Sequence, residues 1–354
     1  MKSRKIRKGL VQHKATPAVM QQKLVEKTPL QEDAGPLLIR ATMSGILLQA
    51  WLHENKNEVR DLLNQYGGIL FRGFAIDTKE KFKSLVDHLE LHALEYTMRS
   101  SPRYEVGDKV YHSTTYPADR MIQMHTESSY AMTWPMKALF CCITPAEVQG
   151  ETPVADTRQV LKRLSPELKG KFSRLGVKYV RNLSRKLGLS WQEVFQTEDK
   201  NLVEAECIRN HMCYTWKSQE ELRIEWNKQA IYTHPYSGEL VWFNHAFFFN
   251  QYTLSEHLRE VLDADSLPFN TSFGDGSPIS RQEFEELKNA WEQSMFVFPW
   301  QKGDVLFLDN MLMAHGRMPF QGKRQILVSL LEPMSEKDFH KENQNIPLND
   351  SPAF

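Results

Sequence analysis

The hydrophobic and polar positions of this chain follow two different periods, which predicts a mixture of helices and strands. Residues 57–66 have a helical pattern that stops at Gly67, and the apolar run 69–74 behind it predicts a buried strand. A second helix is expected to open at Asp77, because Glu80 stands three residues later in a capping-box position. The apolar face of this helix would consist of Phe82, Leu85, Val86 and Leu89.

The rest of the chain alternates between the same two patterns. Residues 156–230 are expected to be mostly helical, with a capping box formed by Ser190 and Glu193. A β-hairpin is expected around the turn residues 236–239. Further helices are expected near residues 253–263 and 280–293, and further strands near residues 137–143, 231–235, 240–243, 296–298, 305–308 and 325–331.

Strands at both ends of the chain with helices between them predict one β core that carries a helical insertion, an α+β fold. In a double-stranded β-helix, or jelly roll, strands distant in sequence become neighbours, so residues from opposite ends of the chain can meet. The insertion and the loop 97–120 are expected to act as lids over the site. The expected organisation of the chain has four parts. These are a basic, partly irregular arm (1–35), a single domain (36–335) with flanking helices, its mostly helical insertion (about 156–230) and a C-terminal tail (336–354).

Composition and charge narrow the class of protein. Lys and Arg together number 44 and so do Asp and Glu, so the overall charge does not indicate nucleic acid or an anionic membrane as a partner. The N-terminal residues 1–25 are basic without any acidic residue, but they lack the apolar segment of a secretory signal. No apolar run approaches the roughly 18 residues that span a bilayer. Cys141 and Cys142 lie in an apolar run without zinc-like spacing, so we expect packed thiols and a reducing, cytoplasmic location.

The stretch from His125 to Glu127 is the first candidate for chemistry. The same His-x-Glu pattern also begins at His88 and at His340, so the pattern alone is weak. Positions i and i+2 of a helix do not face each other, and we place His88 in the middle of a helix. On a strand such positions point to the same side, and residues 121–127 alternate as a strand or strand end would. His125 and Glu127 can therefore chelate together, the alternative being hydrogen-bonded core or surface residues.

A second histidine, His315, strengthens the interpretation of His125 and Glu127 as metal ligands. His315 follows the predicted strand 305–308 and the polar residue Asp309. Two imidazoles and one carboxylate can bind one face of a ferrous ion and leave the opposite face open for a cosubstrate and O2. Arg324 leads into the next strand, where a planar guanidinium can bind a carboxylate through two hydrogen bonds. Arg324 and Arg317 could instead form structural ion pairs.

Seven short motifs occur in order along the chain, and their order is much more specific than any one of them. They are Gly68 to Phe74, His125 to Glu127, Trp134-Pro135, Gly150 to Pro153, Trp242 to Asn244, Gly274 to Ser277 and Trp300 to Arg324. With these motifs, from about Gly67 to Leu331, the chain resembles the iron(II)/2-oxoglutarate dioxygenases of the taurine dioxygenase (TauD/TfdA) type. Within that family it resembles the branch of the syringomycin-pathway aspartyl hydroxylase and, more distantly, clavaminate synthase.

The resemblance implies that the catalytic metal ligands are His125, Glu127 and His315. Glu127 stands where Asp is commoner, as it does in clavaminate synthase-like members. A carboxylate at this position excludes the halogenase subtype, in which a small residue makes room for chloride. Val328 stands where taurine dioxygenase has an arginine for the sulfonate, so taurine is not expected as the substrate.

The resemblance also implies the contacts of the cosubstrate, 2-oxoglutarate. Thr152 would hydrogen-bond one of its carboxylates, and Arg324 would pair with its distal carboxylate. Arg317 would assist with cosubstrate or substrate, with a structural ion pair as the alternative. Fe(II), 2-oxoglutarate and O2 are thus the expected cofactors and cosubstrates.

The reaction implied is oxidation of an unactivated C–H bond with release of succinate and CO2. The branch suggests an amino-acid substrate, free or tethered to a carrier protein, in specialised-metabolite biosynthesis. Hydroxylation is the first expectation, and desaturation, epoxidation or cyclisation would use the same cofactors. A zinc hydrolase and a non-catalytic jelly-roll binding protein are the alternatives outside this class. Candidate substrate contacts, with ordinary surface charges as the alternative, are Arg99, Arg103, Asp119, Arg223 and Glu225.

Overall fold

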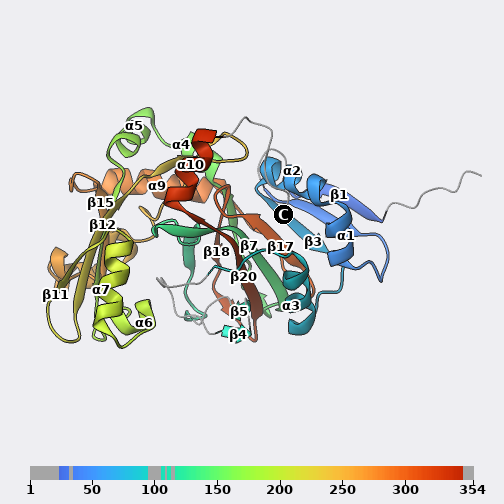
Figure 1. Cartoon of the computed structure of the whole chain (residues 1–354), viewed down its shortest axis with the longest axis horizontal. Coiled ribbons are helices and arrows are strands. Elements are labelled where there is room, and N and C mark those ends of the chain that lie inside the picture. Colours follow the sequence, from blue (N-terminus) through green and yellow to red (C-terminus); the bar gives the residue numbers. More distant parts are fainter. Residues whose placement is uncertain (1–23, 32–34, 95–104, 108–109, 113–115, 346–354) are drawn as a thin grey trace, which may run out of the picture.

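The structure, a computed structural model, consists of two facing β sheets with helices on one side and a further sheet on the other (Figure 1). The residues that it describes are 24–31, 35–94, 105–107, 110–112 and 116–345. The arrangement is α+β, and the core contains strands from both ends of the chain, as predicted.

The larger of the two facing sheets has eight strands, and the N-terminal strand β1 lies at one of its edges. All neighbouring strands are antiparallel except β2 and β3, which run parallel. In spatial order the strands are β1 (Val25–Pro29), β2 (Leu37–Ala41), β3 (Gly68–Arg72), β17 (Val305–Asp309), β7 (Thr133–Thr144), β20 (Gln325–Ser335), β5 (Val110–His112) and β4 (Glu105–Gly107).

The smaller facing sheet has four strands and carries two of the candidate metal ligands. Its strands are β16 (Met295–Phe296), β9 (Val154–Asp156), β18 (Met313–Arg317) and β6 (Ile122–His125). Two short pairs complete this region, β19 (Phe320–Gln321) with β8 (Val148–Gln149) and the hairpin of β13 (Ile231–Thr233) with β14 (Leu240–Trp242). The predicted hairpin is therefore confirmed.

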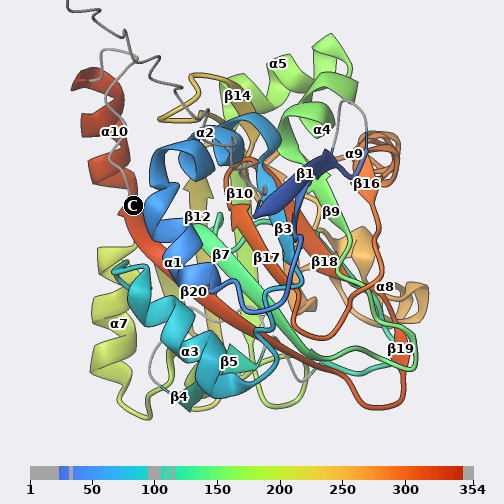
Figure 2. The ribbon, with the colours of Figure 1, turned by 90° about the vertical axis from the view of Figure 1, so that its right-hand side faces the viewer.

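Strand alternation explains how the larger sheet is buried on both faces. In β17, Leu306 and Leu308 face the smaller sheet, whereas Val305 and Phe307 face the helices. The helices on that face, α1 (Leu48–Glu54), α2 (Lys56–Tyr66) and α3 (Lys79–His88), appear beside the sheet in Figure 2. Helix α2 ends where Gly67 takes a left-handed conformation with φ of 69°, as the sequence predicts.

The insertion was expected to be mostly helical, and this expectation needs correction. It does contain helices, but three of its segments are strands that join a later strand in a four-stranded sheet, seen at the left of Figure 1. The sheet order is β11 (Cys213–Trp216), β12 (Leu222–Lys228), β10 (Val177–Leu183) and β15 (Phe269–Phe273). The helices of the insertion are α4 (Thr157–Arg163), α5 (Pro166–Leu175), α6 (Trp191–Phe195) and α7 (Lys200–Arg209). After it come α8 (Glu256–Val261) and α9 (Arg281–Ser294), with single 3-10 turns η1 (Gln251–Thr253) and η2 (Ala264–Ser266).

The physical reason for the strands is visible in β10, whose residues alternate between buried and partly exposed. The buried face also contains the charged residue Arg181, so the alternation is hidden in the sequence. The capping boxes at Ser190 with Glu193 and at Ser280 with Glu283 are both formed, which confirms the starts of α6 and α9.

Strand β12 also joins the insertion to the core. The indole Nε1 of Trp226 donates to the carbonyl oxygen of Tyr130 at 2.7 Å, and Nζ of Lys228 donates to that of Ala131 at 2.6 Å. Tyr130 and Ala131 belong to the turn that follows β6, so the insertion holds this turn directly.

Both predicted terminal regions contain regular structure. Residues 25–29 of the expected irregular arm form β1, which pairs with β2, while residues 1–23 and 32–34 lie outside the described residues. The expected tail begins with helix α10 (Glu336–Asn345), because Phe339 is buried against Trp134 and Tyr232. Residues 346–354 lie outside the described residues.

Two smaller expectations can also be checked. Cys141 and Cys142 are buried and free, and burial raises the pKa of the Cys142 thiol to about 12, so both thiols pack as apolar groups. Among the helices of the described residues, none combines the length and the apolar character that a membrane span requires.

Candidate metal centre and cosubstrate site

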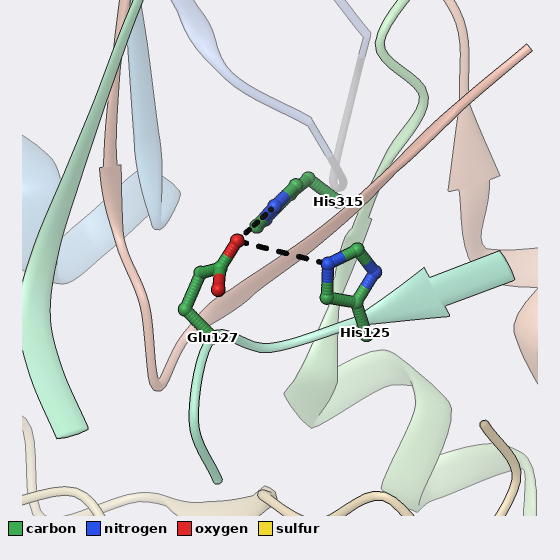
Figure 3. Close-up of side chains that lie close together, drawn as sticks. All are labelled: His125, Glu127 and His315. Carbon is green, nitrogen blue, oxygen red and sulfur yellow. Dashed lines mark ion pairs between the residues drawn. The ribbon is translucent and has the colours of Figure 1, made fainter. Parts of the chain in front are cut away.

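Three side chains from the two ends of the chain converge at the smaller sheet (Figure 3). His125 is the last residue of β6 and lies opposite His315 of the neighbouring strand β18. Glu127 does not continue the strand, as the alternation suggested, but stands in the turn directly after it. Both histidines nevertheless face the carboxylate of Glu127.

The distances between these side chains suit a shared metal ion. Oε1 of Glu127 lies 3.7 Å from Nε2 of His125 and 3.3 Å from Nε2 of His315, and the candidate ligand atoms all lie within 4.8 Å of one another. Neighbouring ligands roughly 2.1 Å from one metal ion are about 3 Å apart, so only a small contraction is required. All three residues are buried. Within the described residues, no other group of His, Cys, Asp and Glu meets this geometry.

A hydrogen bond from Nδ1 of His125 orients the ring so that Nε2 can bind a metal ion. Nδ1 of His125 lies 2.8 Å from the backbone oxygen of Gln123. A carbonyl oxygen can only accept a hydrogen bond, so Nδ1 carries the proton and Nε2 keeps its lone pair. The donor set of two nitrogens and one oxygen therefore fits a ferrous ion bound on one face.

The turn that carries Glu127 is held by Asn310, a residue that the sequence analysis did not select. The backbone nitrogen of Glu127 donates to Oδ1 of Asn310 at 2.7 Å, and Nδ2 of Asn310 donates to the oxygen of Glu127 at 2.9 Å. Nδ2 also donates to the oxygen of Pro135 at 2.8 Å. The acidic residue is thus fixed to the turn between β17 and β18, which leads to His315.

Asp309 organises the same turn from the other side. Its Oδ1 accepts hydrogen bonds from the nitrogens of Met311 and Leu312, while its Oδ2 lies 2.9 Å from Nζ of Lys137 and 3.2 Å from Nε2 of His234. Burial by itself would raise the pKa of Asp309, but Lys137 and His234 lower it well below its ordinary value. The carboxylate therefore stays ionised although it is fully buried.

Arg324 and Thr152 lie together beside the smaller sheet. Nε of Arg324 donates to the oxygen of Gly150 at 2.7 Å, and Nη2 lies 3.4 Å from Oγ1 of Thr152. Nε1 of Trp300 donates to the same Oγ1 at 3.0 Å. Burial, together with the charge of Arg317, lowers the pKa of Arg324 to about 10, so the guanidinium remains charged at neutral pH.

No carboxylate of the described residues forms an ion pair with this guanidinium, since its two hydrogen bonds there go to neutral oxygens. A largely buried cation with neutral partners is a suitable receptor for the carboxylate of a ligand. This arrangement fits 2-oxoglutarate, whose distal carboxylate the sequence analysis assigned to Arg324.

Arg317 has other partners. Its terminal nitrogens donate to the backbone oxygens of Tyr116, Pro117 and Arg120. These bonds join β18 to residues 116–120, so they give Arg317 a structural role. The alternative considered for Arg317 was a structural ion pair, but its partners here are backbone oxygens. Cosubstrate binding by Arg317 remains a prediction.

Comparison with known proteins decides the family. Residues 26–331 match the model of the family described as taurine catabolism dioxygenase TauD, TfdA family. The chain belongs to the TauD/TfdA family. It is therefore an iron(II)- and 2-oxoglutarate-dependent dioxygenase, and the zinc hydrolase and the non-catalytic binding protein are set aside.

Two relatives are similar over most of their length. The dapdiamide synthesis protein DdaC of Enterobacter agglomerans is 37% identical over 78% of this chain and 85% of its own. A clavaminate synthase-like protein of Arabidopsis thaliana is 28% identical over 88% of this chain and 96% of its own. The resemblance to the clavaminate synthase-like branch is therefore confirmed.

Solved structures share the fold at low sequence identity. PvcB of Pseudomonas aeruginosa, described as an iron, α-ketoglutarate-dependent oxygenase, superimposes with a TM-score of 0.53 at 14% identity, over 91% of this chain and 98% of its own. AAD-2, solved with Mn(II) and N-oxalylglycine, has a TM-score of 0.53 at 15% identity, over 87% of this chain and 96% of its own. These similarities confirm the predicted jelly-roll core.

The dioxygenase has a further buried histidine next to the candidate metal centre, His245, which the sequence analysis missed. Its ring centroid lies 6.0 Å from that of His125, and its Nδ1 lies 2.7 Å from Oγ of Ser129. Burial, assisted by the neighbouring His125, lowers the pKa of His245 well below its ordinary value. The signal in the sequence that could have indicated it is a histidine directly before the apolar run 246–249.

Three of the candidate substrate contacts of the dioxygenase lie among the described residues. Arg223 forms an ion pair with Glu225 in the insertion sheet, with Nε and Oε1 2.6 Å apart, as the alternative for both residues expects. Asp119 is exposed. Arg99 and Arg103 lie outside the described residues.

Proposed function

We propose that His125, Glu127 and His315 bind Fe(II) in this dioxygenase, and that Thr152 and Arg324 bind 2-oxoglutarate. The observation that carries the proposal is the buried group of two histidines and one glutamate, with ligand atoms within 4.8 Å of one another. Bound iron and 2-oxoglutarate supply the oxidising chemistry, in which substrate, O2 and 2-oxoglutarate give hydroxylated substrate, succinate and CO2.

The protein's own residues would bind, orient and shield. Arg324 would pair with the distal carboxylate of 2-oxoglutarate, and Thr152, held by Trp300, would hydrogen-bond a carboxylate of the same molecule. Phe248 packs on the ring of His125 with centroids 5.0 Å apart, and Phe140 packs on His315 at 4.8 Å. These rings restrict the rotation of the ligands and exclude water from their apolar side.

We further propose that the substrate is an amino acid, free or tethered to a carrier protein, and that an unactivated C–H bond of it is hydroxylated in specialised-metabolite biosynthesis. The role of the relative DdaC in dapdiamide synthesis supports this class of substrate. Desaturation, epoxidation and cyclisation need the same cofactors, and mass analysis of the product distinguishes them. The free cysteines of the described residues support a cytoplasmic location.

An anaerobic binding experiment tests the metal and cosubstrate sites. Fe(II) and 2-oxoglutarate added together should produce the visible charge-transfer band of the chelate in the wild type but not in the variant His125→Ala/His315→Ala. His88→Ala is a matched control, because exposed His88 begins the same His-x-Glu pattern at the end of α3, and its band should be unchanged. A full band in the double variant would refute the proposed ligands.

A turnover experiment tests the substrate. Succinate release should rise above the background rate with at least one member of a panel of free L-amino acids and aminoacyl carrier proteins, and the product should gain one oxygen atom. If the band forms and every member of the panel fails, the cofactor proposal stands and the amino-acid proposal is wrong.

A further inference from the structure

His245 occupies a fixed position beside the proposed metal ligands. Its backbone nitrogen donates to the hydroxyl of Tyr179 at 2.9 Å, and the preceding Asn244 donates through Nδ2 to the oxygen of Ala230 at 2.8 Å. Tyr179 is itself fully buried. The segment after β14 is therefore held by polar contacts to β10 and to the start of the hairpin, so it cannot shift freely.

The ring of His245 is oriented as well. Nδ1 lies 2.7 Å from Oγ of Ser129, a fully buried residue two positions after Glu127. Aromatic rings pack around the imidazole, with the ring of Tyr130 at 4.8 Å and those of Phe248 and Phe249 at 5.1 Å between centroids. Ring flips are thereby disfavoured, because a flip would break the bond to Ser129.

The second nitrogen of this ring is unused within the described residues. Nε2 of His245 is buried and has no hydrogen-bond partner there. Leaving such a nitrogen without a partner is unfavourable, so a water molecule or a ligand is expected to pair with it. His245 is 1% exposed, comparable with Glu127 at 1% and His315 at 4%, so it is enclosed as deeply as the proposed metal ligands.

We propose that His245 contacts the substrate. Ser129 orients the imidazole ring, and Nε2 forms a hydrogen bond with a polar group of the substrate. This inference rests on the proposed function, because it assumes a substrate beside the metal ligands. It deepens that proposal by assigning the residue that positions the reacting carbon. The three rings around His245 would contact the apolar part of the same molecule.

The surroundings of His245 favour a particular substrate group. The hydroxyl of Ser129 donates its only proton to the backbone oxygen of Thr126 at 3.4 Å. Nδ1 of His245 is therefore the donor of the 2.7 Å bond to Oγ of Ser129, and Nε2 of the neutral ring is left as a hydrogen-bond acceptor. The group next to His245 is therefore a donor of the amino-acid unit, an N–H or O–H group.

Two isosteric variants isolate the role of Nε2. In His245→Asn the side-chain amide can still reach Ser129 from the position of Nδ1, but nothing replaces Nε2. In His245→Gln the amide reaches the position of Nε2. Substrate affinity is measured from the change in the visible band of the Fe(II) and 2-oxoglutarate complex, titrated with whichever free L-amino acid or aminoacyl carrier protein supports turnover in the wild type.

We expect His245→Asn to weaken substrate binding about 10- to 100-fold, and His245→Gln to recover most of this loss. In His245→Asn, the ratio of oxidised substrate to released succinate should also fall, because a misplaced substrate is missed by the oxidant. A merely structural role would lower both products together and would leave this ratio unchanged. The band without substrate reports whether the metal centre is intact.

The group that His245 meets is tested with matched probes of the accepted substrate. Its N-acetyl form removes the ammonium charge and keeps one N–H donor, so its binding should still depend on His245. Wild-type affinity and an unchanged product ratio in His245→Asn would overturn the inference. Absence of turnover in the wild type with every probe would instead overturn the proposed substrate class, so the two failures are distinct.

Discussion

The side-chain amide of Asn310 pairs with both backbone groups of Glu127, which lies 183 positions earlier in the chain. In Asn310→Ala these buried bonds are lost, so we expect the free energy of unfolding to fall by about 2–4 kcal/mol. The affinity for Fe(II) should fall about 10- to 100-fold, because the turn no longer fixes the carboxylate. Urea unfolding and metal titration measure the two effects.

Asn182 offers a matched control for this prediction. Its Nδ2 also donates to two backbone oxygens, those of Asp265 and Leu267, but it lies in the insertion sheet away from the metal ligands. Asn182→Ala should lower stability and leave the metal affinity within about threefold of the wild type. Equal losses of metal affinity in the two variants would show that Asn310 has no special role.

The pKa of Asp309 predicts how stability depends on pH. Because folding lowers this pKa, the stabilisation by Lys137 and His234 is fully present above about pH 4, the ordinary value for an aspartate, and is lost as the pH falls further. At pH 7, Asp309→Asn should cost about 3–5 kcal/mol, since Lys137 stays buried without its anionic partner. The difference from the wild type should narrow below about pH 4 in chemical unfolding.

A double variant separates charge burial from loss of the turn. Lys137→Met together with Asp309→Asn removes both charges, so the double variant should be more stable than Asp309→Asn alone. If the loss of stability of the double variant relative to the wild type equalled the sum of the losses of the two single variants, the ion pair would not be the cause.

Arg324 should determine the affinity for 2-oxoglutarate. Arg324→Gln removes a charged pair with the distal carboxylate, so we expect the KM for 2-oxoglutarate to rise about 100-fold, with a smaller rise in Arg324→Lys. Arg317→Gln should raise this KM less than Arg324→Gln does, because the terminal nitrogens of Arg317 already donate to backbone oxygens of residues 116–120. Similar KM values for both glutamine variants would contradict these separate roles. Steady-state kinetics at varied 2-oxoglutarate concentration provides the comparison.

Ligand-linked stabilisation tests the metal centre without turnover. Mn(II) and 2-oxoglutarate, each at about 100 times its Kd, should raise the melting temperature of the wild type, since ligands bound only to the folded state add about 2.7 kcal/mol each. The variant His125→Ala/His315→Ala should show no such rise with Mn(II). Differential scanning calorimetry with and without EDTA measures the difference, and a rise with Mn(II) of equal size in the double variant would show that another site binds the metal.

The sequence predicted those features that depend on local signals. The capping box of Ser190 and Glu193 and the hairpin after Ile231 involve residues close in the chain, and both are present. Strand β10 was missed because Arg181 interrupts its apolar face, and a single charge hides a period of two over seven residues.

For the site, the sequence brought together His125, Glu127 and His315 through residue type and family resemblance, and the structure places them around one point. It could not identify Asn310 or His245. Their roles come from contacts with Glu127 and Ser129, far away in the chain, and neither residue carries a spacing that reveals such contacts.

Trp226 and Lys228 of the insertion sheet hold the turn that begins with Glu127. The insertion is consequently not an exchangeable module. A chimera that takes this segment from another dioxygenase would have to bring matching donors for the carbonyls of Tyr130 and Ala131, or the imported specificity would come with a weakened metal centre. Engineering of substrate range in this enzyme should therefore graft side chains onto the existing strands and leave the backbone of β12 in place.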